Sequence, residues 1–276
     1  MPERIVTIRC PDDRVFDLGL SELFQHQRVV AILVWRDVKI RYRRTFFGAG
    51  WAVLQPFATM VVFSVIFGHF IGVPSEGLPY PVFAYAGLLP WTFFAQSFNQ
   101  ASTGVARNSS LLSKVYLPKL AIPVSSVIAV LPDFLVAFLV LLAMMAWYGI
   151  VPSLAILTLP IFLGFAALTA LGVGLWLSAL DVRFRDVRYT FAFVQQLWFY
   201  ATPVVYPSSV VDNPVAAAVL SLNPMAGVTT GFRWALLGGA APALTPLLIS
   251  VAAVIAVFVT GALVFRRVAR TAIDHL

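Results

Sequence analysis

The sequence predicts an all-α integral membrane protein. We expect six transmembrane helices, an N-terminal amphipathic interface helix, and short re-entrant periplasmic helices between spans five and six. The chain is 60% hydrophobic and 11% charged, whereas soluble domains carry about 25% charged residues. Several apolar runs reach the roughly 20 residues that a membrane-spanning helix needs. Of the 19 Lys and Arg residues, 18 fall on one side of the predicted spans and only Arg233 on the other.

Residues 1–20 form a polar lead without the apolar run of a cleavable signal peptide. We therefore expect both termini to be cytoplasmic. Cys10 is the single cysteine, which excludes an internal disulfide framework and a cysteine-rich metal site. The net charge of +7 follows from the basic cytoplasmic loops, so no nucleic-acid partner is expected.

Residues 21–50 are predicted to contain a basic amphipathic helix lying along the cytoplasmic membrane surface. Its basic residues are Arg36, Lys39, Arg41, Arg43 and Arg44. At 100° per residue, Arg36, Lys39 and Arg43 share one side of this helix. Asp37 precedes Arg41 by four residues, the order that favours a helical ion pair. A basic cluster that only fixes orientation is the alternative, but it does not explain the ordered faces.

The transmembrane domain is predicted over residues 51–270, followed by a cytoplasmic tail at 271–276. Its six spans are expected at about 51–71, 80–103, 122–147, 154–180, 189–206 and 246–265. Between the last two, Pro and Gly interrupt the apolar run, and the pieces 215–222 and 225–237 are too short to span. In span four, Ala166, Ala170 and Gly174 form a row of small residues suited to close helix packing.

Polar residues inside the spans are candidates for a translocation path. Gln96 and Asn99 share a face near the end of span two, which indicates either hydrogen bonds between helices or an aqueous path. Asp133 lies within span three, where a carboxylate is costly and has either a structural or a functional role. No Lys or Arg lies inside a span, so we expect Asp133 to be protonated or to contact a hydroxyl, an amide or water.

The chain carries no Gly-Lys dipeptide, so it has no phosphate-binding P-loop of its own. Its three histidines are far apart in sequence and predict no metal or catalytic cluster. The basic loop after span two, residues 108–119, contains no acid and is expected to form a short helix ended by Pro118.

A series of short motifs resembles the membrane permease subunit of bacterial ABC exporters for O-antigen, capsule and teichoic acid, within the type-2 ABC exporter family. The resemblance covers about residues 20–270. Its motifs are Trp-Arg-Asp-x-Lys-x-Arg-Tyr from Trp35, Gly-x-x-Trp at 48–51, Pro56, Lys-x-x-x-Pro at 114–118, Arg-Asp-Val-Arg at 185–188, Thr-Pro-Val-Val-Tyr-Pro at 202–207, Asn223-Pro224 and Phe232-Arg233.

The resemblance implies a transporter subunit in the bacterial inner membrane, not an enzyme. Two copies of this chain would form the path, with two copies of a separate ATP-binding subunit carrying ATP and Mg; this chain would hold no cofactor. The substrate would be a lipid-linked glycan. Residues that would couple transport to the ATPase are Asn108, Lys114, Tyr116 and Lys119. Residues expected to line the channel or its gate are Phe63, Phe67, Gln96, Asn99, Asp133, Trp198, Tyr200, Tyr206 and Arg233.

Aromatic side chains suit this substrate, because sugars stack their C–H faces on rings; at least half of the aromatics are nevertheless expected to face lipid. Two other functions are compatible with an all-α integral membrane protein of this composition. One is export of a drug or another lipid by the same family. The other is an integral-membrane lipid-modifying enzyme, which would need a carboxylate or histidine cluster that the sequence does not offer.

The charge distribution predicts which loops face outward. In a Cys10→Ser background, a cysteine at Ser75 should react with an impermeant maleimide in intact cells, and a cysteine at Ser109 should not. Permeabilised cells should label both positions, which controls for reactivity. Labelling of Ser109→Cys alone in intact cells would reverse the predicted topology.

Overall fold

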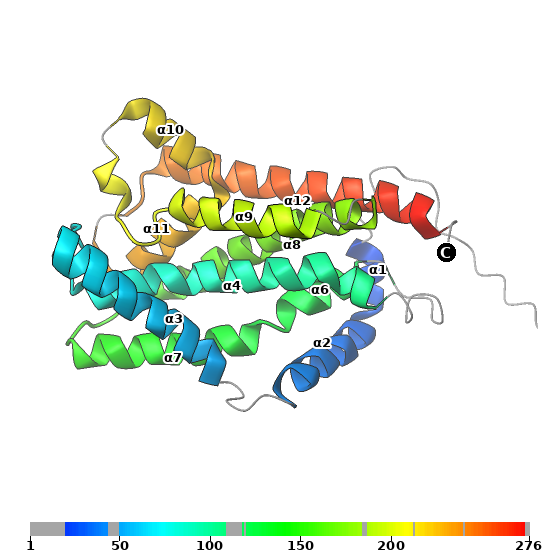
Figure 1. The fold of residues 1–276 in the computed structure, drawn as a ribbon, viewed down its shortest axis with the longest axis horizontal. Helices are drawn as coiled ribbons and strands as arrows, with labels where there is room; N and C mark the ends of the chain where they lie inside the picture. Colours follow the sequence, from blue (N-terminus) through cyan, green and yellow to red (C-terminus); the bar gives the residue numbers. More distant parts are fainter. Residues whose placement is uncertain are drawn as a thin grey trace, which may run out of the picture.

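The computed structural model of the chain describes residues 20–43, 50–108, 118, 120–183, 187–211, 213–239 and 241–273. All regular elements in these ranges are helices, as expected (Figure 1). Some predicted functional residues lie outside the described ranges: Arg44, Lys114, Tyr116 and Lys119.

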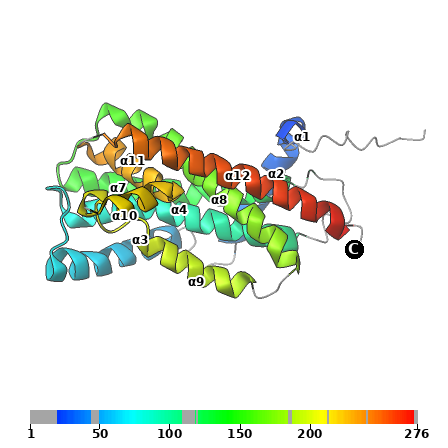
Figure 2. The ribbon, with the colours of Figure 1, turned by 90° about the horizontal axis from the view of Figure 1, so that it is seen from above.

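The helices form an elongated bundle. Its first half contains α1 (Leu20–Gln25), α2 (Gln27–Tyr42), α3 (Gly50–Phe63), which continues as the π-helix η1 (Ser64–Ile71), α4 (Tyr80–Arg107), α6 (Ala121–Ile128) and α7 (Leu131–Trp147). Its second half contains η2 (Leu154–Thr158), α8 (Leu159–Arg183), α9 (Val187–Tyr200), η3 (Ser208–Val210), α10 (Pro214–Leu222), α11 (Pro224–Leu237) and α12 (Leu244–Ile273). Figures 1 and 2 show α4, α8 and α12 ending at the same end of the bundle, with α7 and α9 running the opposite way.

Four stretches are long and apolar enough to cross a membrane: Val53–Ile71, Ala121–Trp147, Leu154–Asp181 and Leu244–Val268. They confirm spans one, three, four and six of the prediction. The pair α10 and α11 counts as a fifth span if its 93° bend is included. The other two expected spans fall short of the same criteria: α4 carries many polar residues, and α9, with 14 residues, is about 21 Å long against a core of about 30 Å.

The predicted pair of short helices before the last span is confirmed. The structure has α10 at Pro214–Leu222 and α11 at Pro224–Leu237, close to the expected bounds. Each begins with an Asn-Pro step, in which the Asn side chain accepts hydrogen bonds from the first free backbone N–H groups. The second step, Asn223-Pro224, produces the bend.

Helix α4 is the centre of the bundle, packed against α3, α6, α7, α8 and α11. The small-residue row of α8 meets it closely, as predicted: Ala166 and Ala170 are fully buried, and a Cβ added at Gly174 would lie 2.6 Å from the Cβ of Ala101 in α4. On another side of α8, a Cβ at Gly172 would lie 2.7 Å from the backbone of Phe258 in α12. Glycine therefore sets how closely α8 approaches α12.

Helix α2 docks on the base of the bundle. Val30 and Leu33 are buried against Ala121 and Ile122 of α6. The opposite side of α2 mixes exposed apolar residues (Ile32, Trp35 and Ile40) with Arg36, Lys39 and Arg43. A face of this composition suits the boundary between lipid tails and head groups.

The contact at Gly172 gives a test of the fold. Replacing Gly172 by Ala should lower the thermal stability of the purified protein, because backbone atoms of α12 occupy the space and overpacking costs about 1–3 kcal/mol. Gly164→Ala in the same helix is the matched control, since a Cβ there meets nothing within 4 Å. Its melting temperature should stay level or rise, as Ala is the better helix former. Equal melting temperatures for the two variants would contradict this packing.

Candidate functional site

Asp133 is bound by the interface helix. At the start of α7, its carboxylate accepts hydrogen bonds from the Arg41 guanidinium and the Tyr42 hydroxyl of α2. The Asp133 side chain is 10% exposed and that of Arg41 is 22% exposed. The expectation that no Lys or Arg pairs with Asp133 is therefore wrong, whereas the expected hydroxyl partner is present as Tyr42. It considered only residues inside spans, whereas Arg41 and Tyr42 belong to α2, which lies outside the predicted spans.

The geometry of α2 separates Arg41 from the other basic residues. At 100° per residue, Arg41 points away from Arg36 and Lys39 and toward the bundle. The expected Asp37–Arg41 pair is also wrong: Asp37 binds Arg36, at 2.8 Å from Nη2. Burial, followed by the hydrogen bond to Asp133, raises the pKa of the Tyr42 hydroxyl. Tyr42 therefore keeps its proton and remains a donor to the carboxylate.

At the opposite end of the bundle, Arg233 is 7% exposed and binds backbone carbonyl groups. Its Nε donates to Phe83 of α4 at 3.2 Å, and its Nη1 donates to Pro203 and Tyr206 at 2.8 and 3.2 Å. Nη2 donates to the carbonyl of Val204. Four hydrogen bonds thus join α11 to α4 and to the turn after α9, which explains how a charge can be buried there.

The bend between α10 and α11 is tied to the same turn. The Asn223 side chain accepts from Trp198 Nε1 at 2.8 Å and donates to the Thr202 hydroxyl at 2.9 Å. Ser250 of α12 donates to the carbonyl of Ser221 at 2.9 Å. Three motifs that are distant in sequence, at 202–207, 223–224 and 232–233, therefore meet at one place.

Aromatic side chains form a layer across α3, α4 and α9. Phe63 stacks on Phe199 with ring centroids 5.7 Å apart, and Trp198 lies edge-on to Phe94 at 5.0 Å. The structure thus brings together some of the predicted lining residues, namely Phe63, Phe67, Trp198 and Tyr200, which are linked by ring contacts. Sequence reasoning left Trp91 out of this set, although it contacts both Trp198 and Phe199.

The polar face of α4 meets α9. Asn99 donates to the Gln195 side chain at 3.0 Å, the hydrogen bond between helices that the sequence offered as one alternative. Asn99 is exposed in the single chain and Gln96 is half-buried. Asp133 lies elsewhere, against α2, so the predicted lining residues do not form one continuous surface. Asn108 ends α4 by donating to the Gly104 carbonyl at 2.8 Å.

Over the described ranges, no group of three or more His, Cys, Asp and Glu side chains could hold a metal ion. The structure has an ion pair that holds α2 at one end of the bundle and hydrogen bonds that hold the α10–α11 bend at the other end. Aromatic side chains and the Asn99–Gln195 pair lie between them.

Comparison with known proteins identifies the family. A family model described as ABC-2 type transporter matches residues 28–237, from α2 to the end of α11. The chain belongs to the ABC-2 type transporter family. The family model thus covers both the Asp133–Arg41 contact of α2 and the residues that bind Arg233 of α11.

Three relatives of known role are similar over most of their length. The chain is 32% identical to the O-antigen export system permease protein RfbA of Myxococcus xanthus, over 78% of this chain and 82% of that protein. It is 27% identical to RfbA of Klebsiella pneumoniae, over 76% and 81%. It is 23% identical to the polysialic acid transport protein KpsM of Escherichia coli, over 78% and 84%. This ABC-2 transporter is thus similar to polysaccharide permeases.

The Asp133 dock can be tested by removing either partner. Arg41→Gln or Asp133→Asn alone should destabilise the purified protein by about 1.5–3 kcal/mol, because each leaves a buried charge without its partner. The double variant should recover most of the melting temperature, since the two amides can still bond.

Arg36→Gln is the matched control. It removes a pair between adjacent residues of the same helix, with side chains 32% and 22% exposed, and should cost less than about 1 kcal/mol. Two results would contradict a specific Arg41–Asp133 interaction. One is an equal loss of stability in Arg41→Gln and Arg36→Gln; the other is a loss in the Arg41→Gln, Asp133→Asn variant that equals the sum of the two single losses.

Proposed function

We propose that this protein is the permease subunit of an ATP-driven exporter that moves a lipid-linked surface polysaccharide across the bacterial inner membrane. The observation that carries the proposal is the similarity to permeases named for O-antigen and polysialic acid, which extends over about four-fifths of their length. Membership of the ABC-2 family and the missing P-loop agree with ATP hydrolysis on a separate subunit. ATP and Mg would be bound there, not by this chain.

The proposed topology has six spans and both termini in the cytoplasm. The basic residues support this orientation, because 18 of 19 fall on the side assigned to the cytoplasm. In this topology α2 lies at the cytoplasmic surface, and α10 and α11 lie toward the periplasm as a gate. The basic loop that ends at Lys119, with Asn108, Lys114 and Tyr116, would contact the ATP-binding subunit.

The path itself is proposed to form between two copies of the chain, each with its own ATP-binding subunit. Helices α3 and α9 lie along one edge of the bundle in Figure 2. Their outward residues are large and apolar, including Phe57, Val62, Phe193 and Leu197. Next to them, the partly buried Phe63, Trp198 and Phe199 and the Asn99–Gln195 pair offer a surface that a glycan can slide along through many weak contacts.

The basic face of α2 is proposed to receive the phosphate groups of the lipid carrier. Lys39 and Arg43 are exposed and Arg36 is half-buried beside Asp37, whereas Arg41 is engaged by Asp133. Each basic residue near an anionic surface contributes about 1 kcal/mol, so three together alter affinity by about a hundredfold.

Export in a deletion strain tests the function. Deleting the gene should remove one surface polysaccharide and leave its lipid-linked form inside the cell; the wild-type gene should restore export. An Arg36→Ala, Lys39→Ala, Arg43→Ala variant should insert normally and fail to export, because the carrier phosphates lose their binding face.

The charge-conserving variant Arg36→Lys, Arg43→Lys is the control and should retain most export. If every surface polysaccharide remains in place in the deletion strain, the proposed function is wrong. Normal export by the triple variant, with normal topology, would reduce the basic face to a membrane anchor.

A further inference from the structure

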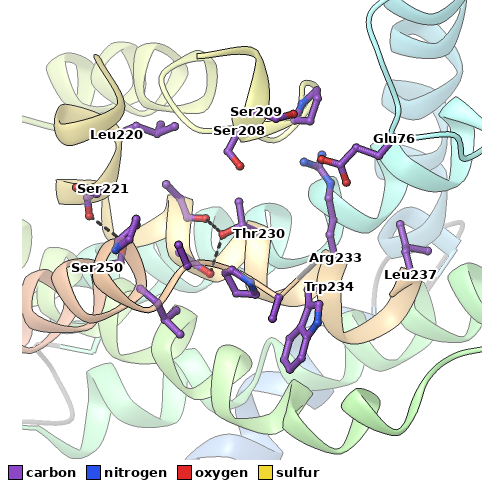
Figure 3. Close-up of a pocket in the computed structure, with 18 of the residues that line it drawn as sticks. Glu76, Ser208, Ser209, Leu220, Ser221, Thr230, Arg233, Trp234, Leu237 and Ser250 are labelled. Atoms are coloured by element: carbon purple, nitrogen blue, oxygen red, sulfur yellow. Dashed lines mark hydrogen bonds between the residues drawn. The ribbon is translucent and has the colours of Figure 1, made fainter. Parts of the chain in front are cut away.

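A cavity of about 400 Å³ lies beside the bent helix pair (Figure 3). Its walls come from α10, α11, the first turns of α12, η3 and the turn before α4. The volume falls at the lower end of the range for small-molecule sites, about 300–1,000 Å³. In the proposed topology this cavity faces the periplasm, at the end of the bundle opposite the α2 dock.

One wall of the cavity carries a cation and an anion that face each other. In Figure 3 the carboxylate of Glu76 is directed toward the guanidinium of Arg233. Arg233 has five N–H groups, and carbonyls of the described residues accept hydrogen bonds from four of them. Arg233 is thus a nine-tenths buried cation at the wall of the cavity.

Glu76 is held in an unusual conformation. Its φ is +56°, and it is the one residue other than glycine with positive φ within the described ranges. The surrounding turn is fixed by bonds between Ser75 and Leu78, in which the Leu78 N–H donates to the Ser75 carbonyl at 3.0 Å. A strained backbone that orients an exposed carboxylate is typical of a binding site.

The remaining walls combine hydroxyl groups with apolar side chains. Ser208 and Ser209 of η3 face the cavity opposite Thr230 of α11 in Figure 3. The Thr230 hydroxyl donates to the carbonyl of Ala226 at 2.7 Å, so its oxygen remains free to accept. Leu220 and Leu237 supply apolar surface. Hydroxyl groups next to apolar patches match a sugar ring, which has hydroxyl edges and C–H faces.

The charges select among the possible ligands. The formal charges of Glu76 and Arg233 cancel, so a phosphate would gain little from Arg233 and be repelled by Glu76. A lipid tail would offer no hydrogen-bond partner to the carboxylate of Glu76, which is costly. Vicinal sugar hydroxyls can donate to the carboxylate of Glu76 and form hydrogen bonds with the hydroxyls of Ser208 and Ser209.

We propose that this cavity is a binding site for a neutral carbohydrate unit, lined by Glu76, Arg233 and the η3 serines and distinct from the aromatic layer. The inference rests on the proposed export of a glycan. The site would hold a sugar unit of the polymer behind the bent pair as the chain leaves the path. Its weak, local contacts suit a polymer that must be released repeatedly.

The test uses the purified full-length protein in detergent. The probe is the set of oligosaccharides released by mild acid from the surface polysaccharide that disappears in the deletion strain. Saturation-transfer NMR should detect their binding to the wild type, and inorganic phosphate should not compete. Ala217→Trp, which places an indole in the cavity from α10, should weaken binding at least tenfold. Glu76→Gln should weaken it about threefold to tenfold, because the amide is a poorer acceptor for two hydroxyls.

Ala218→Trp is the matched control, since Ala218 neighbours Ala217 in α10, is exposed, and does not line the cavity. It should bind the oligosaccharides as the wild type does, with all variants checked for equal melting temperature. No binding by the wild type, equal binding by both tryptophan variants, or competition by phosphate would overturn the site. A deletion strain that keeps all its polysaccharides would instead overturn the proposed function, so the two failures are distinguishable.

Discussion

A charge buried in an apolar helical bundle is stable only when the fold supplies its partners, and this constraint shapes both ends of the molecule. Asp133 at one end binds Arg41 and Tyr42, which fixes α2 against the start of α7. Arg233 at the other end binds carbonyls of α4 and of the turn after α9, which fixes α11. These partners add to the apolar packing of α2 on α6 and of α11 on α4, α8 and α12.

The sites of Asp133 and Arg233 lie at opposite ends of the bundle and are connected through α4. Helix α4 contacts both α11, which carries Arg233, and α7, which begins at Asp133. The close contacts of α8 with α4 and α12, set by Gly174 and Gly172, support α4 from the other side. The cavity beside Glu76 sits next to the Arg233 site, so occupancy by a sugar would act on α10.

Several site residues were predictable from sequence, but their roles were not. Asp133 stood out because a carboxylate within an apolar run is rare, and Arg233 because it was the one basic residue on its side of the predicted spans. Their partners come from residues 92 positions away for Arg41 and 150 positions away for Phe83. Periodicity reports which side of a helix a residue occupies, but it does not report what that side meets. The incorrect Asp37–Arg41 pair has the same origin, because a local spacing rule was applied where a distant carboxylate competed for Arg41.

The sequence by itself determined the helical membrane class, the four most apolar spans, the paired short helices and the basic side, because composition, run length and Pro-Gly punctuation are local properties. Its motifs also pointed to the family that the comparison identified. The tertiary structure decided that Asn223, Trp198, Thr202 and Arg233 form one clamp, and that Glu76 faces a cavity. These contacts depend on how helices distant in sequence cross, and that is set by the packing of small and large side chains over the whole bundle.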